Sequence, residues 1–539
     1  MSIQTLMNQV LSSGGYATVL TSFIAMIFSI ILFKVLGKRD DLAGISMPPS
    51  PSWLWGHDKE VFENNVGDSY TKWLNQLGFV IKIRGAFFHP EILLVADTKA
   101  CTHILQTNIY DYHHSKIVRP RIERLLGRSL GWVEGAREHR RMRGLVAPSL
   151  TPENIKAMSP QIYAAAEDAR QHTEEMIVAG GGKKIFNAMD LTGRTTLDIT
   201  GRVAFDHNFK LGLDEDAQAI LGAWRKMVNI GMQFKGFMAL TLLRRFPWLN
   251  HVPITSNRGQ NKVKTTIQQG VAQELVKRGS TEDGALASSD NGKGKDLLSL
   301  LVEATNQGRI PRQEMMDHIT MFIMAGHETT GQTLAYTLWL LGKRPDIQEK
   351  LRQEVLDFAG EPSYDQISNK LPYLDAVTKE ALRMFPALPY MERVATKNDV
   401  LPLQTPIITS DGKTITEVPV RKGQIIVLPI IAMNRLDAIW GDGTEFRPER
   451  WLKPLPNPEL LPHGYGNTLT FSEGPRNCVG FRLGIFQFKA VLFTFVKNLR
   501  FTDTGAELGH KMCSSLQPYV VGELENAPNI PVSVSCVDQ

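Results

Sequence analysis

The chain has few cysteines, and they lie far apart. Its 539 residues include only four, at positions 101, 478, 513 and 536, and no two of them form a C-x-x-C pair. This spacing argues against a disulfide scaffold and against a structural zinc site. The sequence also lacks any N-x-Ser/Thr acceptor for N-glycosylation. Together these absences favour a reducing compartment, outside the secretory lumen, for the body of the chain.

A strong charge of either sign is also missing. The formal net charge is +5 and the isoelectric point is near 8.8. A positive charge this weak and dispersed does not indicate a nucleic-acid-binding protein. It fits contact with an acidic protein partner or an anionic membrane surface. No internal repeat and no linker divides the sequence, and a hydrophobic content of 43% supports one large domain.

Charged side chains are absent from residues 1–15, and a long apolar run follows at 16–36. About twenty helical residues span the roughly 30 Å hydrocarbon core of a bilayer. A cleaved signal peptide usually carries its positive charges before a shorter apolar core. Here Lys34, Lys38 and Arg39 come at or after the end of the run. The sequence therefore predicts an uncleaved, single-pass anchor with the following domain in the cytosol.

This prediction divides the chain into four parts. Residues 1–15 would be a short lumenal N-terminus and residues 16–36 the transmembrane helix. The basic, proline-rich segment 37–56 would form a hinge, because its Pro-Pro-Ser-Pro stretch cannot continue a helix. Residues 57–539 would form the folded domain.

The pattern of this domain is mainly helical. Residues 98–390 have apolar positions three and four apart, which predicts helices. Residues 78–97 predict two strands joined by a turn, and 400–430 predict strands around a hairpin turn at Asp411. Residues 279–296 are rich in Gly, Ser, Asp and Lys, which predicts a mobile surface loop. The expected fold class is mainly α with small β-sheets.

One cysteine lies in a loop with an unusual sequence. Residues 471–480 read Phe-Ser-Glu-Gly-Pro-Arg-Asn-Cys-Val-Gly, and an apolar helical run follows. Gly474 and Gly480 permit a tight backbone and the close approach of a flat ligand. Backbone N–H groups at a helix start stabilise negative charge on sulfur. The pattern predicts a loop that directs the Cys478 thiolate at a metal, whereas Cys478 on its own would equally suit a buried structural cysteine.

A long apolar helix, predicted at 311–341 with Pro311 in its first turn, contains a second conspicuous segment. Its centre reads Ala-Gly-His-Glu-Thr-Thr at 325–330. Small residues, an acid and a hydroxyl are poor choices for a buried helix, and such a conflict often marks a functional site. We expect a broken middle, with room beside Gly326 for a flat cofactor. A crossing of two helices at small residues would explain the same pattern.

Two further elements have charged residues at regular spacing. Glu380 and Arg383 are three residues apart on a predicted helix, so they share a face and can pair. A Pro-Glu-Arg sequence ends at Arg450. His327 is interpreted as a core or surface histidine rather than a metal ligand.

These motifs resemble those of the cytochrome P450 family. The family pattern Phe-x-x-Gly-x-Arg-x-Cys-x-Gly matches residues 471–480, and Ala/Gly-Gly-x-Asp/Glu-Thr matches 325–329. Its Glu-x-x-Arg and Pro-Glu-Arg elements match at 380–383 and 448–450, in the family order. The resemblance runs from the anchor to about residue 520. It implies the cytochrome P450 fold, with haem between a long central helix and the cysteine loop.

The resemblance also implies roles for single residues. Cys478 would be the axial ligand of the iron of haem b, and Thr329 and Glu328 would deliver protons. Glu380, Arg383 and Arg450 would form a buried charge network. His139 stands where the family often has a tryptophan. The remaining expected haem contacts are Phe471, Arg476, Gly480, His139, Arg143, Arg393, Ala325 and Gly326, with Arg476, Arg143 and Arg393 at the propionates.

The implied activity is that of a monooxygenase of the endoplasmic reticulum membrane. Electrons would come from NADPH through a flavin enzyme, cytochrome P450 reductase, with cytochrome b5 as a second donor. The chain would bind membrane lipid, dioxygen and a lipophilic small molecule that it hydroxylates or epoxidises. The sequence is similar to fungal members of secondary metabolism, which act on molecules such as terpenoids or polyketides. The expected pocket segments are 108–131, 225–240, 322–329, 387–391 and 513–518.

Two other readings remain open at this point. The chain could be a haem-thiolate isomerase or dehydratase that rearranges a peroxide without dioxygen or a reductase. It could also be a non-catalytic haem-binding membrane protein. Members that rearrange peroxides often lack the helix threonine and acid, so Thr329 and Glu328 favour the monooxygenase.

Overall fold

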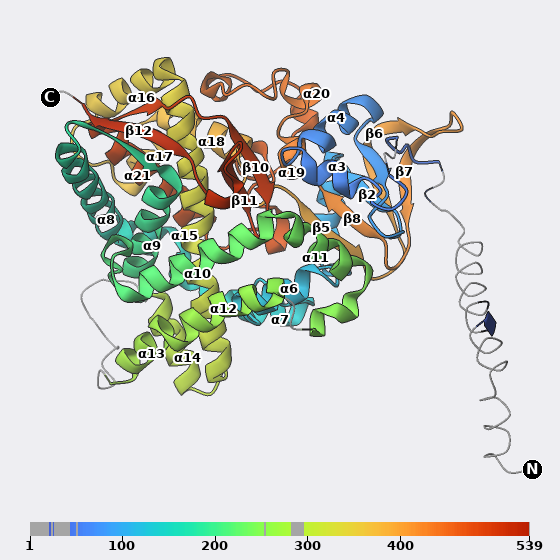
Figure 1. Ribbon diagram of the computed structural model, residues 1–539, viewed down its shortest axis with the longest axis horizontal. Coiled ribbons are helices and arrows are strands. Elements are labelled where there is room, and N and C mark those ends of the chain that lie inside the picture. Colours follow the sequence, from blue (N-terminus) through green and yellow to red (C-terminus); the bar gives the residue numbers. More distant parts are fainter. Residues whose placement is uncertain are drawn as a thin grey trace, which may run out of the picture. The chain divides into compact units, whose positions relative to one another are not determined.

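Helices make up most of the described part of the chain (Figure 1). The computed structural model describes residues 52–252, 255–281 and 296–537, together with 21, 22, 25, 42 and 44–49. Contacts separate Met1–Ile45 from a unit formed by Ser46–Gln539, and the helices α3–α21 and all the strands belong to the second unit. The predicted anchor lies outside the described residues except at Thr21, Ser22 and Ala25, and the loop expected at 279–296 lies mostly outside them.

The mainly helical expectation for 98–390 is confirmed. The α-helices are α3 (Asp58–Glu63), α4 (Asp68–Leu77), α5 (Thr98–Thr102), α6 (Val118–Leu126), α7 (Ala136–Val146), α8 (Pro152–Ala179), α9 (Ala188–Phe205), α10 (Glu215–Met232), α11 (Phe234–Arg245), α12 (Thr255–Gln269), α13 (Val271–Thr281), α14 (Leu297–Asn306), α15 (Arg312–Lys343), α16 (Pro345–Asp357), α17 (Tyr364–Asn369), α18 (Pro372–Met384), α19 (Ile430–Met433), α20 (Asp437–Trp440) and α21 (Phe481–Asn498). Among the described residues, no helix is both long enough and apolar enough to cross a bilayer.

The strands form small separate sheets, as expected. They are β1 (Val80–Ile83), β2 (Ile92–Val95), β3 (Tyr112–His113), β4 (Lys183–Asn187), β5 (Met391–Ala395), β6 (Asp399–Ile408), β7 (Thr414–Val420), β8 (Ile425–Leu428), β9 (Leu499–Asp503), β10 (Leu508–Met512), β11 (Leu516–Val520) and β12 (Pro531–Cys536). The largest sheet has the order β1-β2-β8-β5-β3, and β4-β12-β9 form a second. The pairs β10-β11 and β6-β7 stand apart. β1 pairs antiparallel with β2, and β6 pairs with β7 across the predicted turn at Asp411.

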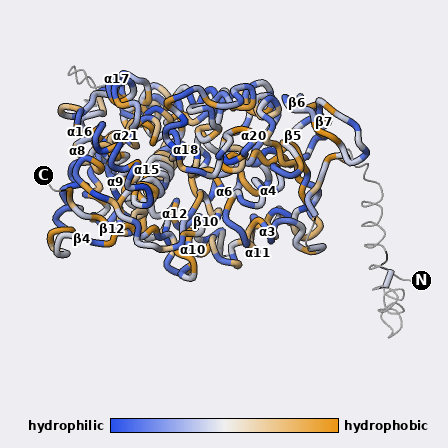
Figure 2. The backbone as a smooth tube through the Cα atoms, turned by 90° about the horizontal axis from the view of Figure 1, so that it is seen from above, coloured by the Kyte–Doolittle hydropathy of each residue, from blue (hydrophilic) through white to orange (hydrophobic). Residues whose placement is uncertain are grey.

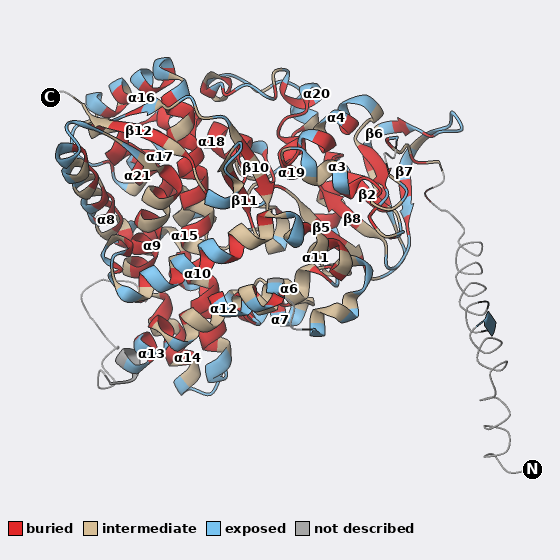
Figure 3. Ribbon diagram, viewed as in Figure 1, coloured by how far each residue is buried: buried red, intermediate tan, exposed pale blue. Residues whose placement is uncertain are grey.

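The longest described helix, α15, passes between two hydrophobic clusters. Its part up to Met324 packs with α10 and α12–α14, whereas its part from Leu334 packs with α8, α18 and α21. Most of α15 is buried in Figure 3. Figure 2 shows hydrophobic and hydrophilic residues interleaved along the elements, as expected when each buries one face. The polar centre of α15 therefore lies where the two clusters meet.

The expectation of a break in this helix is wrong. α15 continues from Arg312 to Lys343 without interruption, and Pro311 is its N-cap rather than part of its first turn. Small residues in the centre allow close packing with α9. A Cβ atom at Gly326 would lie 2.6 Å from Oγ1 of Thr200, and one at Gly331 would lie 2.8 Å from Oγ1 of Thr196. Gly326 thus makes room for α9, and a contact of Gly326 with a flat cofactor stays a prediction.

Candidate functional site

A cavity of about 480 Å³ lies between α15 and the cysteine loop. Thr329 lines one wall and Cys478 lines another. The remaining lining is mainly apolar and comes from α6, α11, α18, α19, α21, β5, β10 and the segments beside them. The polar, charged and motif residues of its lining include His114, Arg121, Arg244, Thr329, Thr330, Glu392, Arg393, Phe471, Arg476 and Cys478. The two segments that the sequence motifs single out therefore meet at one space.

The cysteine loop is held by its backbone. The N–H of Cys478 donates to the carbonyl of Phe471 at 2.9 Å. Gly474 has a φ of +71°, and a Cβ there would lie 2.3 Å from the carbonyl oxygen of Leu105, so only glycine suits this position. A Cβ at Gly480 would meet no atom within 4 Å. The loop packs tightly on one side and leaves open space beside Gly480.

Cys478 is accessible from the cavity that it lines, and the surrounding walls of that cavity enclose its thiol. Burial raises the pKa of this thiol, whereas the backbone N–H of Gly480 and the charge of Arg143 act in the opposite direction. Gly480 is the N-cap of α21. Donors at a helix start therefore face the sulfur, as the sequence predicts.

Two arginines in the cavity wall have unsatisfied donors. The Nε atoms of Arg393 and Arg476 are buried and have no hydrogen-bond partner in the described part of the chain. Arg476 also donates to the carbonyl of Val133 at 2.8 Å and pairs with Glu134 at 3.1 Å. Buried donors require acceptors. An anionic group such as a haem propionate would supply them, so one thiol, an open space and two arginines fit haem.

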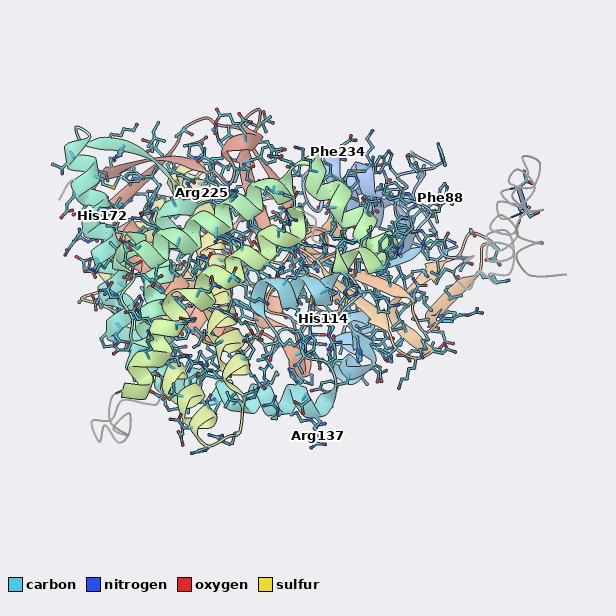
Figure 4. All side chains as sticks on the ribbon, turned by 60° about the horizontal axis from the view of Figure 1, so that its bottom comes forward. Phe88, His114, Arg137, His172, Arg225 and Phe234 are labelled. Atoms are coloured by element: carbon cyan, nitrogen blue, oxygen red, sulfur yellow. The ribbon has the colours of Figure 1, made fainter. Side chains whose placement is uncertain are left out.

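His114 is a cavity residue that the sequence motifs do not identify. It follows the short strand β3, and Figure 4 places it beside α6. Its Nδ1 lies 2.7 Å from Oε1 of Glu134. Burial, and then the charge of Arg393, lower the pKa of His114 to about 4, so the ring is neutral at neutral pH. No sequence motif marks this histidine, although it lies within the expected pocket segment 108–131.

His139 and Arg143 do not line the cavity. Arg143 donates to the backbone carbonyl and to Oδ1 of Asn477, both at 2.7 Å, and thus supports the residue before Cys478. Nδ1 of His139 lies 3.1 Å from the Tyr110 hydroxyl. The structure brings these two residues to the back of the cysteine loop. Direct haem contact by either one remains a prediction.

Thr329 and Glu328 face different surroundings. The Thr329 hydroxyl lines the cavity and donates to the carbonyl of Ala325 at 2.9 Å, and Ala325 itself is exposed one turn earlier. Glu328 is buried and points away from the cavity lining, toward β11. Its Oε1 accepts from Oγ of Ser515 at 2.8 Å and from Nε2 of Gln517 at 2.7 Å. Burial raises the pKa of Glu328 to about 7, although these hydrogen bonds oppose the rise.

His327 is a core histidine, in agreement with the interpretation from sequence. It is buried, and its Nδ1 lies 2.8 Å from the carbonyl oxygen of Ile323 in the same helix. Burial lowers its pKa to about 4. Its Nε2 is also buried and has no hydrogen-bond partner in the described part of the chain, so the interpretation of His327 as a core histidine rests on its burial and on the contact of Nδ1.

Glu380 lies at the centre of a buried network. Its two oxygens accept from Nη2 and Nε of Arg383 at 2.7 and 2.9 Å. Nε of Arg450 donates at 3.0 Å, the N–H of Arg447 at 2.8 Å and Nε1 of Trp451 at 2.9 Å. Glu380 and Arg383 are fully buried, and Arg450 nearly so. The expected ion pairs are therefore present and connect α18 with the Pro-Glu-Arg segment.

The expected pocket segments contribute unevenly. Segment 387–391 lines the cavity, but Arg225 of segment 225–240 lies at the surface of α10 and pairs with Asp190 (Figure 4). Phe234 is also exposed. Periodicity predicts that these residues are helical but does not give the direction in which each side chain points.

Comparisons with known proteins agree with this geometry. The family model described as Cytochrome P450 matches residues 47–518. The chain is 29% identical over 523 residues to cytochrome P450 monooxygenase claW of Ampulloclitocybe clavipes, covering 94% of this chain and 95% of that protein. It is 29% identical over 517 residues to cytochrome P450 monooxygenase 128 of Postia placenta, covering 93% and 94%. With the family model matched over most of its length, this chain belongs to the cytochrome P450 family.

Proposed function

We propose that this chain is a monooxygenase that inserts one oxygen atom of dioxygen into a lipophilic small molecule, by hydroxylation or epoxidation. The observation that carries the proposal is the shared cavity with Cys478 on one wall and Thr329 on another. When bound there, haem b would supply the oxidation chemistry, which thiolate ligation favours. Cys478 would hold the iron, and Arg393 and Arg476 would bind the propionates.

The residues of α15 would handle protons. The Thr329 hydroxyl faces the cavity and can donate or accept a hydrogen bond there. Glu328, whose pKa is about 7, can exchange a proton near neutral pH on the other side of the helix. Ser515 and Gln517 hold its carboxyl in place. The presence of both groups favours oxygen insertion over the rearrangement of a peroxide.

Electrons would come from NADPH through cytochrome P450 reductase, with cytochrome b5 as a second donor. Arg137 and Arg140 of α7 are exposed and are candidates for contact with an acidic partner. Arg141, in contrast, already pairs with Glu138 and Glu314. We place the chain at the endoplasmic reticulum membrane, with residues 16–36 as the anchor and the domain in the cytosol. Substrates from fungal secondary metabolism, such as terpenoids or polyketides, fit the apolar lining.

The test uses membranes that contain the full chain, a reductase, NADPH and isotope-labelled dioxygen. A lipophilic extract is added and labelled products are sought by mass spectrometry. A labelled product that depends on NADPH supports the proposal. A normal carbon monoxide spectrum without any labelled product from a broad substrate set would favour the rearrangement reading or a non-catalytic haem protein.

The matched variants are Cys478→Ser and Cys536→Ser. The first should abolish the red-shifted carbon monoxide band of the reduced protein, because the thiolate ligand is lost. The second changes a half-buried cysteine far from the cavity lining and should leave the band in place. Survival of the band in Cys478→Ser would contradict the ligand assignment.

A further inference from the structure

A second, smaller cavity of about 110 Å³ borders the first. Both cavities are lined by the same set of residues at their boundary: Ile117, Arg121, Leu240, Arg244, Tyr390 and Met512. Arg121 lies in α6, and Ile117 directly precedes this helix. Leu240 and Arg244 lie in α11. A molecule that extends from Thr329 toward α11 therefore passes these side chains.

Positive charge predominates at this boundary. Arg244 is matched by two carboxylates, since it lies 3.3 Å from Asp58 and 2.9 Å from Glu392. Lys511 lines the smaller cavity and donates to the backbone carbonyls of Phe62 and Glu63. The negative charge of Glu63 also acts on Lys511 and offsets part of the lysine's charge.

Arg121 and Arg124, one turn apart on α6, have no carboxylate within 4 Å in the described part of the chain. Arg124 instead donates to Gln260 at 2.8 Å and to Asn250 at 3.1 Å. Arg121 makes longer hydrogen bonds, which it donates to the Ser514 hydroxyl at 3.3 Å and to the Cys513 sulfur at 3.9 Å. Arg121 also lines both cavities, whereas Arg124 lines only the smaller one. Arg121 is thus a guanidinium in the cavity wall that has no anionic partner among the described residues.

We propose that the substrate is a lipophilic carboxylic acid whose carboxylate binds Arg121, with its apolar part directed toward Thr329. This inference rests on the proposed function and names the substrate class. A guanidinium matches a carboxylate with two parallel hydrogen bonds, and it is weakly hydrated, which suits a partly buried site. The neighbouring Arg124 and Lys511 add to the positive potential, which favours an anion over a neutral molecule. The mainly apolar remainder of the cavity accommodates the rest of the substrate.

The experiment measures binding to the full haem-loaded protein by equilibrium dialysis. The probes are straight-chain, polycyclic and aromatic lipophilic acids, each paired with its methyl ester. We expect the preferred acid to bind about tenfold or more tightly than its ester, and Arg121→Gln to remove this difference while ester affinity is kept. Arg121→Lys, which keeps the charge but not the planar fork, should retain part of the preference.

Arg128→Gln is the matched control, because Arg128 follows α6, is exposed and lines neither cavity. It should bind acids and esters as the unchanged protein does. Equal affinity for acids and esters across the panel, no binding of any acid, or a preference that survives in Arg121→Gln would overturn the inference. A normal carbon monoxide spectrum and a labelled product from a neutral molecule would leave the proposed function intact in each of these cases.

Discussion

At the scale of single residues, Glu328 links the stability of the protein to pH. Its carboxyl is buried and has a pKa of about 7, against an ordinary value of 4.5. Between these two values the folded state holds a proton that the unfolded state has lost. The protonated Glu328 therefore stabilises the folded state fully below about pH 4.5, and this stabilisation is lost as the pH rises through 7. The difference between the two pKa values corresponds to about 3 kcal/mol.

Glu328→Gln should remove this pH dependence. The amide keeps an oxygen that accepts from Ser515 and Gln517 but has no charge to bury. We expect the stability that the unchanged protein loses between pH 5 and 7.5 to be largely retained in the variant. Denaturation midpoints at both pH values measure this, with Glu507→Gln at an exposed position as the control. An equal loss in both proteins would show that Glu328 titrates outside this range.

Thr329→Ala should separate electron use from product formation. Without the hydroxyl in the cavity wall, proton delivery fails and electrons are diverted to hydrogen peroxide. We expect the product formed per NADPH to fall by about tenfold or more, while the carbon monoxide band is unchanged. Thr329→Ser keeps a hydroxyl and should keep most of the coupling. Unchanged coupling in the alanine variant would remove Thr329 from the proton route.

Sequence motifs predict single residues best where the chemistry permits few alternatives. Cys478 and Thr329 lie in short motifs, and both line the cavity. Gly474 was predicted to permit a tight backbone, and its positive φ agrees. For His139 and Arg143 the motif does not determine which groups the side chains contact. Arg143 binds Asn477 and does not line the cavity. Motifs give residue types at set spacings, whereas contacts depend on neighbours that are remote in sequence.

At the scale of elements, the crossing of α9 and α15 depends on glycine. Gly326→Ala would place a Cβ 2.6 Å from Oγ1 and 2.8 Å from Cγ2 of Thr200. Overpacking of this kind destabilises proteins by about 1–3 kcal/mol. Thr200→Ala removes both of these atoms, so the double variant should be more stable than the sum of the single changes predicts.

A double-mutant cycle from denaturation midpoints measures this coupling. Gly222→Ala supplies the control, since a Cβ at Gly222 meets no atom within 4 Å. If the effects of Gly326→Ala and Thr200→Ala on stability are additive, α9 and α15 can move apart without cost and the Thr200 side chain does not limit residue 326. The segment 325–330 would then owe its small residues to another cause.

The network around Glu380 is the second feature at this scale. Glu380→Ala would leave Arg383 and Arg450 buried without their carboxylate, which costs about 3–5 kcal/mol. We expect this variant and Arg383→Ala to lose haem during purification and to denature at lower temperature. Lys350→Ala breaks an exposed ion pair with Glu449 and should change stability by less than about 1 kcal/mol. Normal haem content in Glu380→Ala would contradict a structural role.

At the scale of the whole molecule, the anchor predicted from sequence has a direct test. Removal of residues 1–36 should move the chain from the membrane pellet to the supernatant after an alkaline wash. The carbon monoxide band should stay, because the cavity is built from residues beyond 100. A full-length chain that already remains in the supernatant would contradict the anchor.

The class of the fold follows from periodicity, whereas the arrangement of the cavity does not. Apolar spacing and turn residues predicted helices over 98–390 and the β6-β7 hairpin, and these are local properties. The cavity wall combines His114 with Arg393 and Arg476, which lie far from it and from each other in the sequence. Their meeting depends on packing between distant elements, which periodicity does not describe. The position of Arg121 in the wall, without a carboxylate partner among the residues that the structure describes, also follows from that packing.

The Glu380 network has a consequence for how the protein opens. Arg383 also donates to the backbone carbonyls of Asn434, Gly443 and Glu445, so one helix side chain holds a segment that includes the short helix α20. Regions joined in this way open together rather than one at a time. In hydrogen exchange, the Arg447 amide, which donates to Glu380, should exchange at the rate of the buried amides of α18. The segment from Asn434 to Trp451 would then behave as part of the slow-exchanging interior.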